Sequence, residues 1–411
     1  MAMNRTRHGN DIRVLMDGRM FAGRFAGVSR VVARLAHTIA SHPGVRVQML
    51  CGDGAMLPLE LRGLVDVIRC DFTRGHLSPA RRWSWEQRHL PRIVSSSGAN
   101  VYHATWNSGV PAHCPVASVL TIHDLIPWNE HRSGISGWLA SAAYRKATLA
   151  SASHATIVTT VSETTRGEVI RTLSLPPEKV ITVHNGADGL GAVEHLQGTD
   201  SRESISDVPH HAAHAGTRYV LYVGGYEPRK NVAAVLRAME QLWRRLDHPI
   251  ELRLTGSRER LDDETNAVMG RLSHPDRVRF LGDVPDDRLV PLYREAACVI
   301  TMTLAEGFGL PVLEAMSLGC PVVCSDLPVF RELAGAAAMM VDPRHPPDAA
   351  QAIHQLLSES DLRASLIDAG LRRAADFPWS AAADKMLAIY KRALRGPVNT
   401  SAFANEPAAS V

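Results

Sequence analysis

The sequence of 411 residues predicts an α/β protein built from two Rossmann-like domains in tandem. The chain is longer than one hydrophobic core usually serves, so two domains of about 200 residues are expected. Short β-rich runs alternate with helical patterns along nearly the whole chain, as in parallel sheets covered by helices on both faces. The alternation stops once, near the middle of the chain, and then starts again, which places the boundary between the domains there.

The first domain is predicted over residues 1–190, as a series of short apolar strands separated by helices. The clearest helical patterns are Val28–Ala40 and Gly137–Ala150. The predicted strands are Ile12–Asp17, Val45–Leu50, Val65–Cys70, Val101–His103, Ala117–Ile122, Thr156–Val161 and Val180–Val183.

Residues 186–216 are rich in Gly, Ser, Asp and His and have no hydrophobic periodicity. This composition predicts an interdomain linker with a mobile insertion. The segment His184–Asp188, which ends the last strand before it, is typical of a turn and is assigned to interdomain packing.

The second domain is predicted over residues 217–380, where apolar residues from Val232 to Leu246 recur at helical spacing. Residues 381–395 are predicted to form a closing C-terminal helix, and residues 396–411 a disordered tail. The predicted strands are Tyr219–Val223, Glu251–Thr255, Val278–Leu281, Cys298–Met302, Pro321–Cys324 and Ala338–Val341.

Composition narrows the class of protein. No apolar run reaches the length of a membrane span, and the polar N-terminus lacks the apolar core of a signal peptide, so a cytoplasmic location is expected. The six cysteines are scattered through apolar stretches, which is typical of reduced thiols. No Cys/His set has zinc spacing, so no structural metal is expected.

Positive charge is concentrated in the first quarter, where residues 1–100 hold 15 Arg, no Lys and 7 acidic residues. The segment Arg81–Arg92 adds Trp83 and Trp85 to this charge. Arg and Trp together suit an anionic membrane surface or a lipid-linked substrate, and a half-buried helix with a solvated basic face remains the alternative. No motif supports nucleic-acid binding.

Glu306 and Glu314 bracket a Gly-x-Gly-x-Pro turn that opens an apolar helix. Pro311 suits the first helical turn, the glycines allow a ligand to approach the backbone, and the helix N-terminus offers N–H groups to an anion. On one helix the two carboxylates would lie about 12 Å apart along the axis, which excludes an acid/base pair. We expect them to contact different parts of one long ligand, with a plain capped helix as the alternative.

Arg229 and Lys230 follow the turn Gly224–Gly225 at the end of a predicted strand and precede a helix. A guanidinium, an ammonium and a helix N-terminus together can bind a diphosphate. A surface turn with solvated basic side chains is the alternative.

Two further candidates lie in the first domain. His123 and Asp124 end an apolar strand, at the sheet edge where ligands of α/β proteins bind, although a single His there is often structural. Gly27 begins a helix after the first strand, so its amide could face an anion, and a plain flexible loop is the alternative.

Taken together, these motifs resemble the retaining GT-B glycosyltransferases of family 4, and the resemblance covers nearly the whole chain. GT-B implies two Rossmann-like domains whose parallel sheets face each other across a cleft. The motifs are Glu306-Gly-Phe-Gly-Leu-Pro-x-Leu-Glu314, Gly-Gly-Tyr-x-x-Arg229-Lys230-Asn, Thr-Ile-His123-Asp124-Leu, Val-x-Asn185-Gly-x-Asp188, Gly319-x-Pro321-Val-Val and Trp85-Glu-Gln.

The resemblance implies catalytic roles for four residues. Arg229 and Lys230 would hold the donor diphosphate and stabilise the departing nucleoside diphosphate. Glu306 would contact the hydroxyls of the donor sugar, and His123 would face that sugar from the other domain. Side-chain cations would replace a metal, so no cofactor is expected beyond the nucleotide-sugar donor.

The resemblance also implies a set of substrate-binding residues. Glu314 would bind the ribose hydroxyls, and Gly27 would give the diphosphate room, although Ala26-Gly27 departs from the Gly-Gly that is common there. The amides of Phe308, Gly309 and Leu310 would lie near the sugar and phosphate. Asp124, Gly224 and Gly225 complete the expected set.

The expected activity is transfer of a hexosyl group, with mannose from GDP-mannose as the expected donor sugar, to a glycan or polyprenyl-linked acceptor. The motifs resemble most those of bacterial surface-polysaccharide and lipopolysaccharide mannosyltransferases. The alternatives are a transferase that uses a UDP-sugar, a sugar-nucleotide 2-epimerase of the same architecture, and an inactive sugar-nucleotide-binding protein.

Overall fold

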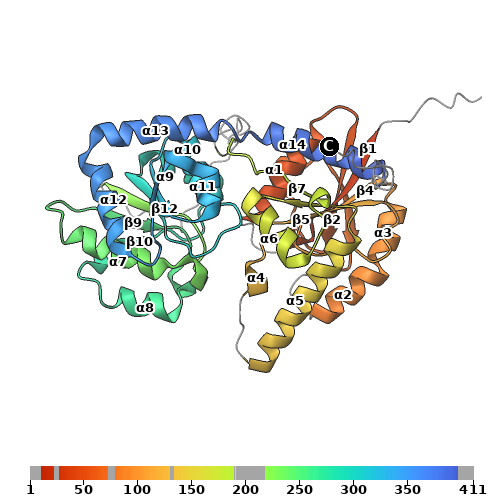
Figure 1. Ribbon diagram of the computed structural model, residues 1–411, viewed down its shortest axis with the longest axis horizontal. Helices are drawn as coiled ribbons and strands as arrows, with labels where there is room; N and C mark the ends of the chain where they lie inside the picture. The colour runs from red at the N-terminus through yellow and green to blue at the C-terminus, as the bar shows by residue number, and fades with distance from the viewer. Residues whose placement is uncertain are drawn as a thin grey trace, which may run out of the picture. The chain divides into compact units, whose positions relative to one another are not determined.

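A computed structural model describes residues 11–22, 27–72, 79–129, 134–188, 190 and 218–396. The chain forms two compact units (Figure 1): unit 1 comprises Met1–His184 and Ser380–Val411, and unit 2 comprises Asn185–Trp379. Most of the predicted insertion within 186–216, and the predicted tail after Gly396, lie outside the described residues.

Unit 1 contains a seven-stranded sheet in the order β3-β2-β1-β4-β5-β6-β7. Every pair of neighbouring strands is parallel, as in β1 beside β4, where Val14 is opposite Val101. The strands are β1 (Ile12–Asp17), β2 (Val45–Gly52), β3 (Asp66–Cys70), β4 (Val101–Ala104), β5 (Ala117–Ile122), β6 (Ile157–Thr160) and β7 (Val180–Thr182).

The helices of unit 1 connect these strands, and α14 comes from the C-terminal end of the chain. Within unit 1, α5 is the long helix that lies beside α2 (Figure 1). The helices are α1 (Val28–Ala40), α2 (Pro79–Arg88), α3 (Leu90–Ser96), α4 (Ile126–Asn129), α5 (Gly134–His154), α6 (Glu163–Leu173) and α14 (Trp379–Leu394).

A buried histidine connects α14 to the sheet of unit 1. His103, in β4, is fully buried; one ring nitrogen lies 2.7 Å from the Tyr390 hydroxyl and the other 2.7 Å from Thr121 Oγ1. Burial lowers the pKa of His103 to about 3, so the ring is neutral near pH 7. The C-terminal helix is therefore bound to unit 1 through a polar contact inside its core.

Unit 2 contains a six-stranded sheet, parallel throughout, in the order β10-β9-β8-β11-β12-β13. Its strands are β8 (Tyr219–Tyr222), β9 (Glu251–Leu254), β10 (Val278–Phe280), β11 (Cys298–Thr301), β12 (Val322–Ser325) and β13 (Met339–Val341). Its helices are α7 (Val232–Trp243), α8 (Asp263–Met269), α9 (Asp286–Glu295), α10 (Leu310–Ser317), α11 (Pro328–Ala334), α12 (Pro346–Ser358) and α13 (Ser360–Ala374).

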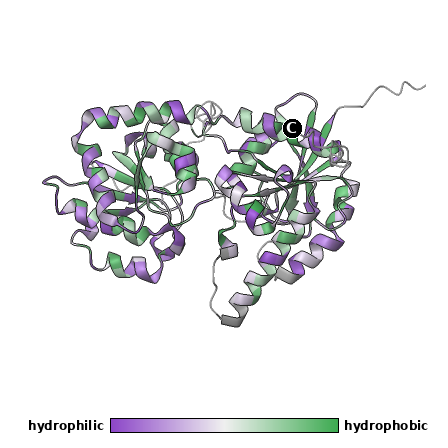
Figure 2. Ribbon diagram, viewed as in Figure 1, coloured by the Kyte–Doolittle hydropathy of each residue, from purple (hydrophilic) through white to green (hydrophobic). Residues whose placement is uncertain are grey.

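Apolar strands and amphipathic helices form the core of each unit. Figure 2 shows apolar colour along the strands and mixed colour on the helices, as expected for sheets covered on both faces. In α7 the residues Val232, Val235, Leu236 and Met239 are buried against the sheet, so the helical spacing read from the sequence marks its packed face.

The predicted α/β class with two parallel sheets is confirmed. The segment Arg81–Arg92 differs from a single helix: α2 ends at Arg88 and α3 begins at Leu90, with Pro91 in its first turn. Proline fits a helix start and disrupts a helix interior, which explains the break. Among the described residues, no helix is both long and apolar enough to cross a bilayer.

Candidate active site

The glycine turn after β8 is held by two tyrosine hydroxyls and a threonine. Tyr222 donates a hydrogen bond of 2.6 Å to the Gly225 carbonyl, and the Gly224 amide donates to Thr255 Oγ1 at 3.2 Å. Tyr226 donates to the Thr255 carbonyl at 2.6 Å. A Cβ on Gly225 would lie 2.5 Å from the Glu227 carboxylate, and this exposed side chain would have to move to make room for it.

Asn231 anchors the segment that carries the two candidate cations. It adopts the left-handed conformation, with φ of 53°, just after the short 3₁₀ turn Pro228–Lys230. Its side-chain amide donates to the carbonyls of Met302 and Pro343 at 3.0 and 2.8 Å. Asparagine tolerates this conformation better than most residues, and both amide hydrogens are used.

The backbone of Arg229 is joined to the loop that follows β11. Its carbonyl accepts hydrogen bonds from the Leu304 amide at 2.7 Å and from Thr303 Oγ1 at 3.0 Å. Its guanidinium Nη1 donates to the Ala305 carbonyl at 3.3 Å. The loops that follow β8 and β11, which carry the two predicted motifs, are thus hydrogen-bonded to each other.

Glu306 lies against both cations. Its Oε2 is 2.5 Å from Lys230 Nζ and 3.7 Å from Arg229 Nη1, although Lys230 and Glu306 are 76 positions apart in the sequence. The side chains of Lys230 and Glu306 are 15 and 18 % exposed, so solvent still reaches the pair. The structure therefore brings together three of the four residues predicted to be catalytic.

Gly309 precedes α10 in a conformation that favours glycine. Its φ is 101°, and an added Cβ would lie 2.4 Å from the Phe330 ring. Leu310 is the first residue of α10, and Pro311 follows in its first turn. Phe308, just before this turn, is buried and packs edge-to-face on Phe377.

Glu314 is buried in α10, where it is 4 % exposed, and its Oε2 accepts a 2.8 Å hydrogen bond from the Tyr293 hydroxyl of α9. Sequence reasoning did not find Tyr293. A tyrosine on the apolar face of a helix gives no signal of its partner, because the contact depends on how α9 and α10 pack.

In unit 1, His123 lies just beyond the carboxyl end of β5 and is buried. Its Nε2 lies 2.9 Å from the Thr105 carbonyl, so Nε2 carries the hydrogen, and its amide donates to Asn107 Oδ1 at 2.8 Å. Burial lowers the pKa of His123 to about 4. The imidazole is therefore neutral near pH 7.

Asp124 and Gly27 both lie just before helices of unit 1. Asp124 Oδ1 accepts from the amide of Ile126, the first residue of α4, at 3.0 Å, as in an Asx turn. Gly27 precedes α1 with a φ of 40°, and an added Cβ would meet no atom within 4 Å. Residues 23–26, just before it, lie outside the described residues.

A buried charge cluster at the end of β1 was missed from the sequence. Arg19 donates to both oxygens of Asp17 at 2.8 and 2.6 Å and to Glu86 Oε1 at 3.0 Å. Its guanidinium lies over the rings of Phe72 and Trp85 at 4.7 and 5.2 Å. Arg19 holds the pKa of Asp17 below its usual value although burial acts in the opposite direction.

The cluster also changes the interpretation of Arg81–Arg92. Trp85 and Glu86 are buried within unit 1, while Trp83 remains 44 % exposed. The two tryptophans therefore do not share one exposed face. Among the residues that the structure describes, no three His, Cys, Asp or Glu side chains converge as metal ligands would.

Two family models match the chain, one in each half. Residues 25–188 match "Glycosyltransferase Family 4" and residues 206–373 match "Glycosyl transferases group 1". Each match contains predicted site residues: His123 lies in the first, and the Arg229–Lys230–Glu306 group lies in the second. The chain belongs to the glycosyltransferases that combine these two domains.

Similar proteins agree with this family. The chain is 32 % identical over 237 residues to O-antigen chain mannosyltransferase B of Escherichia coli; the match covers 58 % of this chain and 61 % of that protein. Its fold resembles sucrose-phosphate synthase of Thermosynechococcus elongatus, with TM-score 0.72, 18 % identity and coverage of 93 and 99 % of the two chains. It also resembles HepE of Anabaena in complex with UDP-glucose, with TM-score 0.68, 18 % identity and coverage of 93 and 100 %. The predicted GT-B architecture of two Rossmann-like units is thus confirmed.

Proposed function

We propose that the protein transfers a hexosyl group from a nucleotide sugar to a glycan or lipid-linked acceptor, with retention of configuration. The pairing of Arg229 and Lys230 with Glu306 at one sheet edge carries this proposal. Negative charge develops on the diphosphate as it leaves, and two cations fixed in advance stabilise that charge without reorganisation. Arginine can bind a diphosphate bidentately while lysine acts as a mobile point charge.

In this scheme Glu306 would also bind the donor sugar. Its carboxylate is paired with Lys230 in the free protein, and a donor diphosphate would take its place beside the ammonium. The carboxylate would then accept hydrogen bonds from the hydroxyls of the donor sugar. Partly exposed ion pairs contribute little net stability, so this exchange costs little free energy.

His123 would act on the donor sugar as a neutral group. Its Nε2 is committed to the Thr105 carbonyl, and its lowered pKa keeps the ring uncharged near pH 7. A neutral imidazole can accept a hydrogen bond through Nδ1 but cannot serve as a cationic acid there. In unit 2, Glu314 would bind the ribose, with Tyr293 setting the position of its carboxylate.

One relative is an O-antigen mannosyltransferase. This similarity supports GDP-mannose as the donor and the synthesis of surface polysaccharide or lipopolysaccharide as the pathway. A UDP-sugar is the alternative donor, since the structurally similar HepE holds UDP-glucose. The family matches name transferases, which disfavours the 2-epimerase. We propose that the reaction needs no metal and takes place in the cytoplasm. Burial of Trp85 removes one of the two tryptophans that suggested contact of Arg81–Arg92 with an anionic membrane.

Two measurements test this function. Thermal unfolding across GDP-, UDP- and ADP-sugars identifies the donor, because a ligand that binds the folded state raises apparent stability by mass action. Release of nucleoside diphosphate is then followed with and without free or lipid-linked mannosides. Each assay is run both with and without EDTA. Acceptor-dependent release that EDTA does not change is expected; conversion of one sugar nucleotide to another without acceptor would instead indicate an epimerase.

A further inference from the structure

A pocket of about 240 Å³ lies within unit 1, between α2 and α5. The side chains of Arg82, Trp83 and Glu86 line it from α2, and Ser141, Tyr144 and small alanines line it from α5. Pockets for drug-sized ligands occupy about 300–1,000 Å³, so this one suits a group smaller than a nucleotide sugar. In Figure 1 the two helices lie side by side in unit 1.

Ser141 gives this pocket an unused hydrogen-bonding group. The residue is 9 % exposed, and its hydroxyl has no hydrogen-bond partner in the described part of the chain. A buried hydroxyl without a partner destabilises the fold, and in native proteins a water, an ion or another ligand often completes its hydrogen bonding. Ser141 lines the pocket, and its Oγ, which has almost no exposed surface, would reach a ligand there through rotation about χ1.

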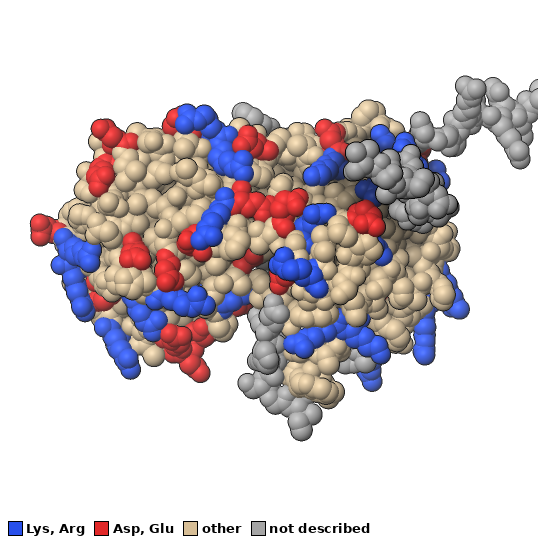
Figure 3. Space-filling model, viewed as in Figure 1, with Lys and Arg blue, Asp and Glu red and all other residues tan. Residues whose placement is uncertain are grey.

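The charges beside the pocket cancel. Glu86 Oε1 accepts from Arg82 at 3.1 Å and from Arg19 at 3.0 Å, and Arg19 is also paired with Asp17. Two carboxylates thus balance two guanidinium groups. Lys and Arg side chains do lie over the α2 and α5 part of unit 1 in Figure 3, but Arg82 is turned to Glu86 and Ser108. A neutral ligand with hydroxyls fits this balance better than a phosphate.

The walls of the pocket suit a sugar ring. Trp83 is 44 % exposed and offers an indole face against which the C–H face of a pyranose can pack. The hydroxyls at the ring's rim would then meet the Ser141 hydroxyl and the Arg82 guanidinium. Five of the ten residues that line the pocket are polar. An acyl chain would remove water from these groups without offering hydrogen bonds, so its binding is disfavoured.

Asn107 links the pocket to the candidate site in the same unit. Its Nδ2 donates to the Tyr144 hydroxyl and to the Asp124 carbonyl, each at 2.9 Å, and its Oδ1 accepts from the His123 amide. Asn107 follows β4, at the carboxyl edge of the parallel sheet where ligands of such folds bind. Hydrogen bonds through Asn107 therefore join Tyr144, in the pocket wall, to the loop that carries His123.

We propose that this pocket between α2 and α5 binds one neutral sugar ring of the acceptor, with Trp83 as the stacking platform and Ser141 and Arg82 as hydrogen-bonding groups. That the ring belongs to an acceptor rests on the proposed transferase function, whereas the sugar site itself does not depend on it. A ring held here would place the growing glycan beside the His123 loop.

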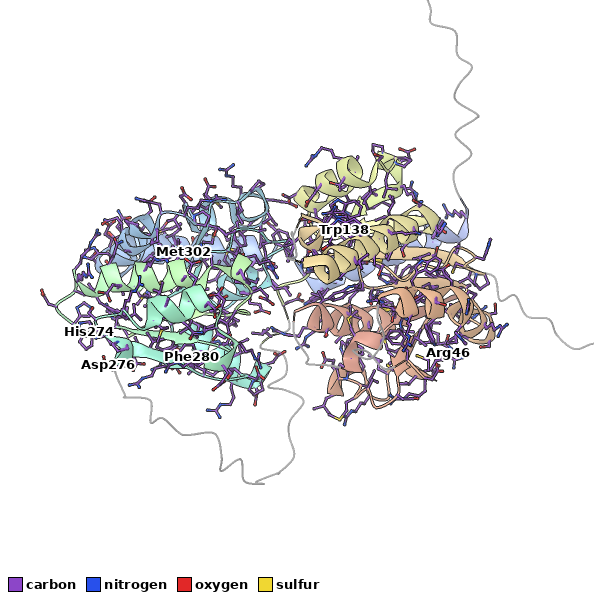
Figure 4. The ribbon with its side chains drawn as sticks, turned by 90° about the horizontal axis from the view of Figure 1, so that it is seen from below. Arg46, Trp138, His274, Asp276, Phe280 and Met302 are labelled. Carbon is purple, nitrogen blue, oxygen red and sulfur yellow. The ribbon has the colours of Figure 1, made fainter. Side chains whose placement is uncertain are left out.

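Fluorine NMR of the protein labelled with 5-fluorotryptophan tests the site directly. The resonances of Trp83 and Trp138 are assigned with Trp83→Phe and Trp138→Phe; Trp138, labelled in Figure 4, lies on α5, is 67 % exposed and does not line the pocket. Methyl α-mannoside, methyl α-glucoside and methyl β-galactoside are titrated separately, with inorganic phosphate in a parallel arm. A saturable shift of Trp83 alone with at least one glycoside is expected. A shift with phosphate only, or no shift with any glycoside, would overturn the proposal.

Ser141→Ala separates binding from a structural role. Loss of one hydrogen bond should weaken glycoside binding by about threefold to tenfold. The thermal midpoint of the free protein should not fall, because the hydroxyl that is removed had no partner. The matched control is Ser153→Ala on the same helix, whose exposed hydroxyl donates to the Leu149 carbonyl, and it should leave glycoside binding unchanged. Unchanged binding in Ser141→Ala would contradict the assignment of that hydroxyl.

Failure of this inference can be told apart from failure of the proposed function. Stabilisation by nucleotide sugars is measured on the same Ser141→Ala protein, and it should match the unaltered chain because the Arg229–Lys230 group belongs to unit 2. Donor binding without any glycoside effect at Trp83 would reject only the subsite. A glycoside effect without binding of any nucleotide sugar would reject only the transferase.

Discussion

Replacing Lys230 by alanine should separate catalysis from folding. The lysine ammonium lies 2.5 Å from Glu306, and after its removal Glu306 keeps Arg229 at 3.7 Å. A partly exposed ion pair contributes about 0–1 kcal/mol, so the free energy of unfolding should fall by no more than that. Loss of one group that stabilises developing negative charge raises a barrier by about 2.7–4 kcal/mol, which is a decrease in kcat of about 10²–10³-fold.

The assay for Lys230→Ala combines nucleoside diphosphate release with urea unfolding. Arg237→Ala serves as the matched control, since it removes an ion pair in unit 2, with Glu264 at 2.8 Å, that lies outside the candidate site. Both variants should unfold close to the unaltered protein, and only Lys230→Ala should lose turnover. Turnover of Lys230→Ala at the rate of the unaltered protein would refute the diphosphate assignment.

Three further predictions concern buried polar groups. Tyr390→Phe should lower the free energy of unfolding of unit 1 by about 1–3 kcal/mol, because it leaves a ring nitrogen of buried His103 without its partner; urea unfolding measures this. Tyr293→Phe should weaken donor binding, seen by calorimetric titration, because the hydroxyl that orients Glu314 is lost, and the fold should persist in circular dichroism. Acid unfolding should detect the two buried histidines, because burial lowers the pKa of His103 to about 3 and that of His123 to about 4. Below the ordinary pKa of ~6.5 the unfolded state binds more protons than the folded state. The contribution of the neutral rings to the free energy of unfolding is therefore complete above pH ~6.5 and is lost as pH falls from there through the folded-state pKa values. Stability that stays constant from neutral pH to pH ~4 would contradict the buried neutral rings.

Much of the fold could be predicted from the sequence because each unit obeys local rules. Apolar runs such as Ala117–Ile122 are buried on both faces of a parallel sheet, so they are continuous rather than alternating. Gly309 and Pro311 mark the start of α10, where a positive φ is followed by a helical first turn. The contact between Lys230 and Glu306 follows from parallel strands that end at one edge.

The remaining features depend on packing that a sequence does not state. Tyr293 meets Glu314 only because α9 and α10 pack together. Arg19 sits in a helical turn that gives no sign of its contact with Glu86, 67 positions away. The unpaired Ser141 hydroxyl looks like any serine of a small-residue helix until α2 is placed beside it.

The central claim is that Arg229 and Lys230 hold the diphosphate of a sugar nucleotide. Titration of the free protein with GDP-mannose and with UDP-glucose, on the unaltered chain and on Lys230→Ala, tests it most directly. We expect one donor to bind the unaltered chain and to bind Lys230→Ala much more weakly, with affinity that falls as salt screens the charges. Equal affinity of both proteins for that donor, or no binding of either nucleotide sugar, would contradict the claim.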